Sequence, residues 1–236
     1  KRPGIADKKE SVSPNQLNIT PSAQAYADAN NIDLSNEGGL VWIKSRSDGQ
    51  SHELVDTVRG NTKFIRTNST TANRTSTSGD VTGFTSSGFS LGATTTAGVN
   101  NSSNEYVSWT FRKAPKFFDI VQYTGTGNNQ TISHNLGSVP GMIITKRTDS
   151  TSDWAVYHRG LNGGTNPATK FIRLNLTNAE SGNSGYWNDT EPTNSVFTVG
   201  SNSTTNANNG TFIAYLFAHN NSDGEFGPSA NQDYEK

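Results

Sequence analysis

Short apolar runs separated by polar turns recur along almost the whole chain. Residues 40–43 form a continuous apolar run, and residues 106–111 carry large apolar side chains at nearly alternate positions. Apolar or alternating runs of about four to eight residues, bounded by Gly, Asn, Pro and Ser, are typical of β-strands. The sequence therefore predicts an all-β protein with antiparallel strands and no helix longer than one or two turns.

Further strands are expected wherever the same pattern returns. They fall at residues 52–58, 64–65, around 84, 89–91, 117–123, 142–145, 154–157, 171–176, 196–199 and 211–218. Residues 1–37 show no sustained period, so we expect an N-terminal arm there, with one short helical turn near residues 23–30. Residues 221–236 are polar and are expected to form a C-terminal tail.

The order of these motifs repeats within the chain. The matched segments are residues 39–44 with 141–146, 62–66 with 169–173, 87–92 with 195–200, and 100–111 with 206–217. A period of about a hundred residues is far longer than a solenoid repeat and has the length of a small β-sandwich. The sequence thus predicts tandem jelly-roll-like antiparallel β-sandwiches arising from an internal duplication, at 38–115 and 116–220. One large sandwich built by duplication is the alternative.

Composition narrows the class of protein. Hydrophobic residues make up 31% of the chain, charged residues 17%, and the formal net charge is −1. Low charge with 9% aromatic residues argues against disorder. A balanced charge offers no footprint for nucleic acid, and no apolar run of about eighteen residues exists to insert into a membrane. The absence of Cys excludes disulfides and thiolate chemistry.

Several motifs resemble a known module. They lie at residues 42–46, 55–60, 88–92, 106–109, 118–125, 132–141, 153–158 and 214–219. Together they resemble a module of tail-associated structural proteins from marine and cyanobacterial tailed bacteriophages. The resemblance implies a concanavalin-like or jelly-roll β fold and a location on the virion. It also implies other virion proteins as partners. Low charge, long polar loops and the absence of disulfides indicate a homo-oligomer, and trimers are common among fibres.

Candidate catalytic residues are few. The four histidines are His52, His134, His158 and His219. No Gly-x-Ser-x-Gly motif accompanies them, and no pair of carboxylates stands out as an acid and base for glycoside hydrolysis. His134 lies in a Gly- and Pro-rich turn, where local bonding is the expected role. We therefore expect no enzyme activity and no cofactor, with glycan degradation as the least favoured alternative.

Aromatic residues in polar loops are better candidates, because sugars stack on exposed rings. Tyr186, Trp187 and Asp189 lie in a loop rich in Gly, Asn and Ser. Trp154, Tyr157 and His158 form a second cluster. The expected glycan contacts are Trp187, Tyr186, Asp189, Trp154 and His158. The alternative is that the large rings plug the ends of the sandwich.

Two further aromatic and polar features carry expectations of their own. Trp42 and Trp109 lie in strong strand motifs and are expected in the core. Residues 188–191 carry oxygens of the kind that bind calcium. A polar turn explains them better, so no metal site is expected.

The function that follows is a non-enzymatic virion protein, a tail fibre or receptor-binding module that recognises a host surface glycan. The loops at 150–158 and 182–194 would carry that recognition. The alternative is a purely architectural virion protein such as a decoration, collar or fibre-shaft protein. Outward-pointing aromatic rings would favour recognition, and aromatic rings buried at subunit contacts would favour architecture.

Overall fold

The computed structural model describes residues 16–17, 26–28, 32–76, 80–92, 99–101 and 103–219. In these ranges the chain is all-β with antiparallel pairing, which confirms the predicted class. The described helices are single turns, α1 (Ser184–Trp187), α2 (Ser203–Asn206), and two 3-10 segments, η1 (Leu161–Gly164) and η2 (Pro167–Thr169). The predicted tail at 221–236 and most of the predicted arm lie outside the described residues.

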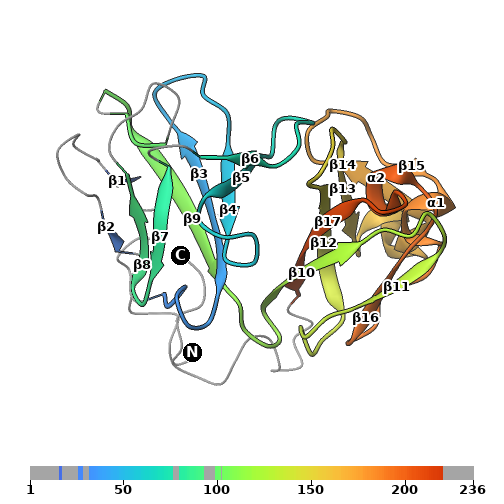
Figure 1. Ribbon diagram of the computed structural model, residues 1–236. Helices are drawn as coiled ribbons and strands as arrows, with labels where there is room; N and C mark the ends of the chain where they lie inside the picture. Colours follow the sequence, from blue (N-terminus) through green and yellow to red (C-terminus); the bar gives the residue numbers. More distant parts are fainter. Residues whose placement is uncertain are drawn as a thin grey trace. The chain divides into compact units, whose positions relative to one another are not determined.

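Two compact units divide the described residues. Unit 1 holds those up to residue 64 together with 74–112, and unit 2 holds 65–73 together with 113–219. In Figure 1 the strands of unit 1 run from blue to green and those of unit 2 from green to red. The short segment 65–73 therefore belongs to unit 2, although it links β5 to β6.

Unit 1 contains a six-stranded sheet in the order β1-β9-β3-β4-β5-β6 and a three-stranded sheet in the order β2-β8-β7. The bounds are β1 Gln16–Leu17, β2 Tyr26–Asp28, β3 Gly39–Ser45, β4 Glu53–Asp56, β5 Lys63–Arg66, β6 Arg74–Thr75, β7 Val81–Thr85, β8 Gly88–Leu91 and β9 Tyr106–Arg112.

The helical turn expected near residues 23–30 is wrong at its centre, where β2 pairs with β8. Tertiary pairing overrides the weak local preference of this Ala-rich stretch. Ile32 and Leu34, also from the predicted arm, are buried in the core of unit 1.

Unit 2 repeats this design. It has a six-stranded sheet in the order β10-β17-β12-β13-β14-β15 and a two-stranded ladder of β11 with β16. The bounds are β10 Phe118–Thr124, β11 Gln130–Ser133, β12 Pro140–Arg147, β13 Trp154–His158, β14 Lys170–Arg173, β15 Ser181–Gly182, β16 Val196–Val199 and β17 Thr211–Ala218.

The two units share one strand topology. The order β9-β3-β4-β5-β6 corresponds strand for strand to β17-β12-β13-β14-β15. The register agrees as well. In unit 1, Trp42 on β3 pairs with Trp109 on β9 and with Leu54 on β4. At the equivalent place in unit 2, Ile144 on β12 pairs with Tyr215 on β17 and with Val156 on β13. The repeated sequence thus encodes the same pairing twice, and common origin by duplication stays a prediction.

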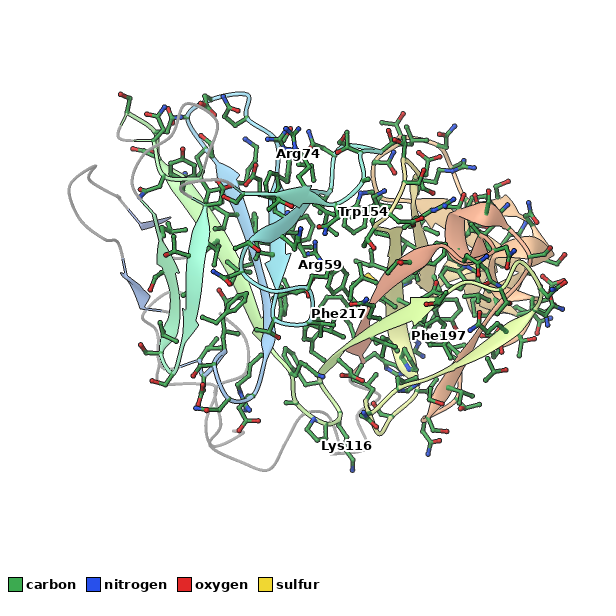
Figure 2. All side chains as sticks on the ribbon, in the orientation of Figure 1. Arg59, Arg74, Lys116, Trp154, Phe197 and Phe217 are labelled. Atoms are coloured by element: carbon green, nitrogen blue, oxygen red, sulfur yellow. The ribbon has the colours of Figure 1, made fainter. Side chains whose placement is uncertain are left out.

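Each unit has its own hydrophobic core. In unit 2, alternate residues of the large sheet face the β11–β16 ladder, and rings from both sides meet between them. Phe197, labelled in Figure 2, is 1% exposed and packs edge-on against Tyr123, with ring centroids 6.0 Å apart. Tyr123 also stacks on Phe212 at 5.1 Å. Burying one such side chain stabilises a fold by about 1.5–3 kcal/mol, so a few rings account for much of the cohesion.

A buried asparagine holds the same position in both units. The Asn100 side-chain amide donates to the carbonyl of Gly92 at 2.6 Å, and Asn206 donates to the carbonyl of Gly200 at 2.7 Å. Both asparagines are almost fully buried, at 1% and 0% exposure. The internal repeat therefore preserves a side-chain hydrogen bond as well as the strand pattern.

Candidate recognition surface

The predicted pair Tyr186 and Trp187 lies inside the core of unit 2. Asn183 caps the single-turn helix α1 by accepting the backbone N–H of Gly185 at 2.8 Å, and the turn points both rings inward. Each residue is 2% exposed, and Tyr186 stacks on Phe171 with ring centroids 3.6 Å apart. The loop is polar in sequence, yet its two rings plug the core, which was the alternative interpretation of this motif.

A hydrogen-bonded tyrosine lies beside Trp187. Tyr157 packs edge-on against the indole at 6.1 Å and donates its hydroxyl to Glu191 at 2.8 Å. The other carboxylate oxygen of Glu191 accepts the N–H of Ala168 at 2.9 Å. Burial, reinforced by this carboxylate, raises the pKa of Tyr157 well above its usual value. Tyr157 is thus a neutral donor that fastens the loop at residue 191, and it has no character of a general acid or base.

Asp189 lies just beyond α1 on the outside of unit 2. It is exposed and has a left-handed backbone with φ of 48°. Its neighbour Asn188 accepts a hydrogen bond from Asn129 at 2.6 Å, which fixes the turn. The acid therefore points to solvent while the adjacent rings point inward, so the three predicted residues share no surface. A sugar contact by Asp189 stays a prediction.

Trp154 is fully buried, and its indole N–H donates to two backbone carbonyls, those of Arg66 and Ser69, each at 3.1 Å. Figure 2 labels this ring. On the neighbouring strand Lys146 lies opposite Trp154 and donates its ammonium to the carbonyls of Thr70 at 3.1 Å and Ser152 at 2.8 Å. Side chains of β12 and β13 thus hold the backbone of the loop at 67–73 by hydrogen bonds.

Backbone hydrogen bonds complete the same contact. The N–H of Ser152 donates to Thr70 at 2.9 Å, and the N–H of Asn73 donates to Thr148 at 2.8 Å. Trp154 was predicted to meet a sugar, but in this structure a loop of the protein itself occupies its polar edge.

Lys146 has an unusual environment for a lysine. Burial lowers its pKa from 10.5 to about 8, and the nearby carboxylate of Asp153 counteracts part of that fall. A depressed lysine pKa is often found at reactive sites. Here the residue is 0% exposed and its protons are directed at carbonyl oxygens, so the side chain serves as a clamp.

His158 lies at the far end of β13 from Trp154. It is exposed, and its Nδ1 accepts the N–H of Gly160 at 3.0 Å. His158 lies four residue steps along the strand from Trp154, a distance of about 13 Å. The predicted second cluster is therefore divided, because Trp154 and Tyr157 are buried and His158 is exposed.

The loop between β14 and β15, residues 174–180, replaces the end of the strand that was expected to run to residue 176. The strand ends at Arg173, and Leu174 and Leu176 are 37% and 44% exposed. Among the described residues only Val58 and Val139 are comparable exposed apolar side chains. The alternation of Leu174 and Leu176 about a polar residue was the available signal, and it was attributed to a strand.

Trp42 and Trp109 are also placed differently from expectation. They face each other across β3 and β9 with ring centroids 5.8 Å apart, and both are partly exposed, so a core location is wrong. His52 lies 6.3 Å from Trp42. The indole Nε1 of Trp42 is buried and has no hydrogen-bond partner among the described residues.

His134 has the local role that its turn predicts. It is 6% exposed and its Nδ1 accepts the N–H of Leu136 at 3.2 Å. Burial lowers the pKa of His134, so the ring stays neutral and able to accept this bond at neutral pH.

In the described ranges, no group of three His, Cys, Asp or Glu side chains is arranged to hold a metal ion. No helix in that part of the chain is both long and apolar enough to span a bilayer.

Comparison with known proteins gives a family without an assigned activity. No curated protein and no solved structure matches this chain. A family model covers residues 24–231, and the chain therefore belongs to the family described as a domain of unknown function, DUF7483.

Proposed function

We propose that the protein is a non-enzymatic structural component of a virion that acts by packing its β modules against other proteins. The virion setting rests on the motif resemblance to tail-associated phage proteins. The mode of action rests on one contact, the grip of Lys146 and Trp154 on the loop at 67–73. That contact is recognition of a protein backbone, and no bond is made or broken.

The surroundings of the candidate residues support an architectural role. Lys146, Trp154 and Tyr157 each direct their polar atoms at groups of the same unit. Tyr186 and Trp187 contribute their rings to the core. Side chains that a chemical reaction would need exposed are committed to holding loops in place, which suits a protein that bears load.

Recognition of a host surface glycan is the second candidate, and one observation favours it. Trp42 and Trp109 form a partly exposed aromatic pair on a sheet, and sugars stack their apolar faces on such rings. Trp187 and Tyr186, with their rings enclosed, are less suited to that role. A glycan site would then belong to unit 1 and not to the loops at 150–158 and 182–194, which are part of unit 2.

Immunogold electron microscopy of purified particles tests the leading proposal. Antibodies against the folded protein should label one repeated position on the virion. Particles that stay unlabelled, although the same antibody detects the purified protein, would overturn the virion role. Saturable binding of the protein to extracted host polysaccharide, lost in Trp109→Ala but kept in the exposed control Val139→Asp, would instead establish glycan recognition.

A further inference from the structure

One edge of the large sheet of unit 2 is formed by β10, which Figure 1 labels. This strand has seven residues, whereas the other strands that end the two six-stranded sheets, β1, β6 and β15, have two described residues each. Its pairing with β17 runs without a register shift from Phe118 to Thr124. An edge strand of this length offers its backbone hydrogen-bonding groups to a partner unless the chain protects them.

The direction of each backbone group of β10 follows from its register. Ala218 donates its N–H to the directly opposite residue Phe117, so the odd-numbered residues from 117 to 123 exchange hydrogen bonds with β17. The even-numbered residues therefore point their N–H and C=O groups away from β17. Phe118 agrees with this rule, because both of its backbone groups bond to Ala114 and not to β17.

Four outward groups at the centre of this edge have no hydrogen-bond partner among the described residues. They are the C=O of Ile120, the N–H and C=O of Gln122, and the N–H of Thr124. Side chains occupy the two remaining outward groups of the same stretch. Asp119 accepts the N–H of Ile120 at 2.9 Å, and Gln130 donates to the C=O of Thr124 at 3.2 Å. The free stretch is therefore capped at both ends.

The pattern of free and capped groups is complementary to itself. When two copies of β10 lie antiparallel about Gln122, this residue faces its own copy, and Ile120 faces Thr124 of the second copy. The two Gln122 residues then exchange two backbone hydrogen bonds, and each Thr124 N–H donates to the Ile120 C=O opposite it. All four free groups of each copy are used, and the capped groups lie opposite one another. This match identifies a second copy of the chain as the partner.

The side chains of the free stretch also suit a partner strand. Gln122 and Thr124 are exposed, and Val121 is partly exposed. Residues 120–124 carry no charge, proline or bulge, which are the features by which sheets commonly protect their edges. In the antiparallel pairing Val121 lies opposite Tyr123 of the second copy. Pairs of β-branched and aromatic residues across two strands stabilise a sheet.

We propose that two copies of the protein pair their β10 edges antiparallel about Gln122, so that the large sheet of unit 2 continues from one copy into the other. The contact uses the same surface on both copies, and it therefore closes as a two-fold dimer. The inference goes beyond the virion role proposed above, because it rests on the backbone of β10 and applies to the free protein in solution.

Proline at position 122 tests the pairing while keeping the hydrogen bonds of the sheet. The N–H that Gln122→Pro removes points away from β17, so the ladder of β10 with β17 is intact. The wild type should show a monomer–dimer equilibrium in sedimentation velocity, and Gln122→Pro should weaken dimerisation roughly tenfold or more. Gln122→Ala keeps the N–H and should dimerise nearly as well as the wild type. A wild type that stays monomeric at every concentration would overturn the proposal.

Opposite charges at position 122 test its place on the symmetry axis and do not depend on proline being tolerated. Gln122→Lys and Gln122→Glu each set like charges opposite one another in a homodimer, so each should dimerise more weakly than the wild type. An equimolar mixture should recover dimerisation, and added salt should weaken it. Thr177→Lys and Thr177→Glu, at an exposed residue between β14 and β15, should behave as the wild type. A mixture that associates no better than either variant alone would refute the axis at Gln122.

A single cysteine locates the contact covalently. The chain has no native Cys. Directly opposite residues of a hydrogen-bonded antiparallel pair have Cα atoms about 5.5 Å apart, which a disulfide can span. Gln122→Cys should therefore give a covalent dimer and nothing larger on mild oxidation, whereas Thr177→Cys should stay monomeric. Equal cross-linking of the two variants would contradict the pairing.

Hydrogen exchange of individual amides reports on the same edge in the unmodified chain. The N–H groups of Gln122 and Thr124 should exchange more slowly in concentrated samples than in dilute ones, because dimerisation covers them. The N–H of Ile120, which already donates to Asp119, is the internal control and should change less. A dimer that leaves the exchange of Gln122 and Thr124 unaltered would use another surface and would overturn the inference.

These measurements separate the inference from the virion role. Dimers that lose association in Gln122→Pro, combined with particles that antibody does not label, would overturn the virion role and support the pairing. A monomeric wild type combined with labelled particles would overturn the pairing and leave the virion role standing.

Discussion

The buried ammonium of Lys146 predicts an unusual dependence of stability on pH. Its pKa is about 8 in the folded protein, lowered from 10.5 chiefly by burial. Between these two values the unfolded chain binds more protons than the folded one, and stability therefore rises with pH. The cost of burying the charge is fully present below pH 8 and is relieved as pH rises toward 10.5.

The size of the effect follows from the two pKa values. The full difference between 10.5 and about 8 corresponds to about 3 kcal/mol. From pH 7 to pH 9.5, roughly 2 kcal/mol of that cost should be relieved. Two tyrosines limit the window, because burial raises the pKa of Tyr123 and Tyr157, which opposes stability at higher pH. Measurements should therefore stop near pH 9.5.

Urea unfolding followed by tryptophan fluorescence measures this prediction. In a background with Trp42→Phe and Trp109→Phe, the remaining indoles, Trp154 and Trp187, both report on unit 2. The free energy of unfolding should rise between pH 7 and 9.5 relative to the same protein carrying Lys146→Met. Lys44→Met, at the equivalent position of unit 1, should follow the parent. A wild-type curve parallel to that of Lys146→Met would refute the reasoning.

Three further substitutions test the assigned structural roles. Asn206→Ala removes three side-chain hydrogen bonds, one buried and two partly buried, and should cost about 3 kcal/mol in urea unfolding. Asn100→Ala removes one such bond among the described residues and should cost about 1 kcal/mol. Trp187→Ala should lower stability by about 3–5 kcal/mol, seen as a fall in melting temperature, because it opens a cavity in the core. An unchanged melting temperature of Trp187→Ala would contradict the core location of the ring and favour its predicted contact with a sugar.

The strand pattern could be predicted because most strands are both apolar and short. Residues 40–43 and 106–111 read correctly as strands, since an apolar run of that length has few other ways to be buried. The end of β14 was misjudged because Leu174 and Leu176 continue the alternation of a strand beyond Arg173. β2 was missed because its pairing with β8 comes from a partner sixty residues away and not from its own composition.

The candidate site was harder to predict, because the sequence shows which residues are polar or aromatic but not whether a side chain points into the core or toward solvent. Tyr186 and Trp187 lie among Gly, Asn and Ser, so local composition favours exposure, and only the cap at Asn183 turns them inward. Trp154 has an apolar neighbourhood, but the carbonyls that satisfy its indole come from Arg66 and Ser69, more than eighty positions earlier. Contacts at that separation leave no trace in a local motif.

Comparison of equivalent positions recovers part of what a local motif hides. A repeat places the same backbone twice, so each difference in side chain at matched positions is a difference in environment and not in fold. Thr67 is buried where Leu174 is exposed, and Ser69 is partly buried where Leu176 is exposed. Trp154 is fully buried, whereas His52 at the equivalent position is only partly buried. The strand pairing agrees at these positions, so the surroundings of each side chain decide its burial, and a comparison of the two units shows where those surroundings differ.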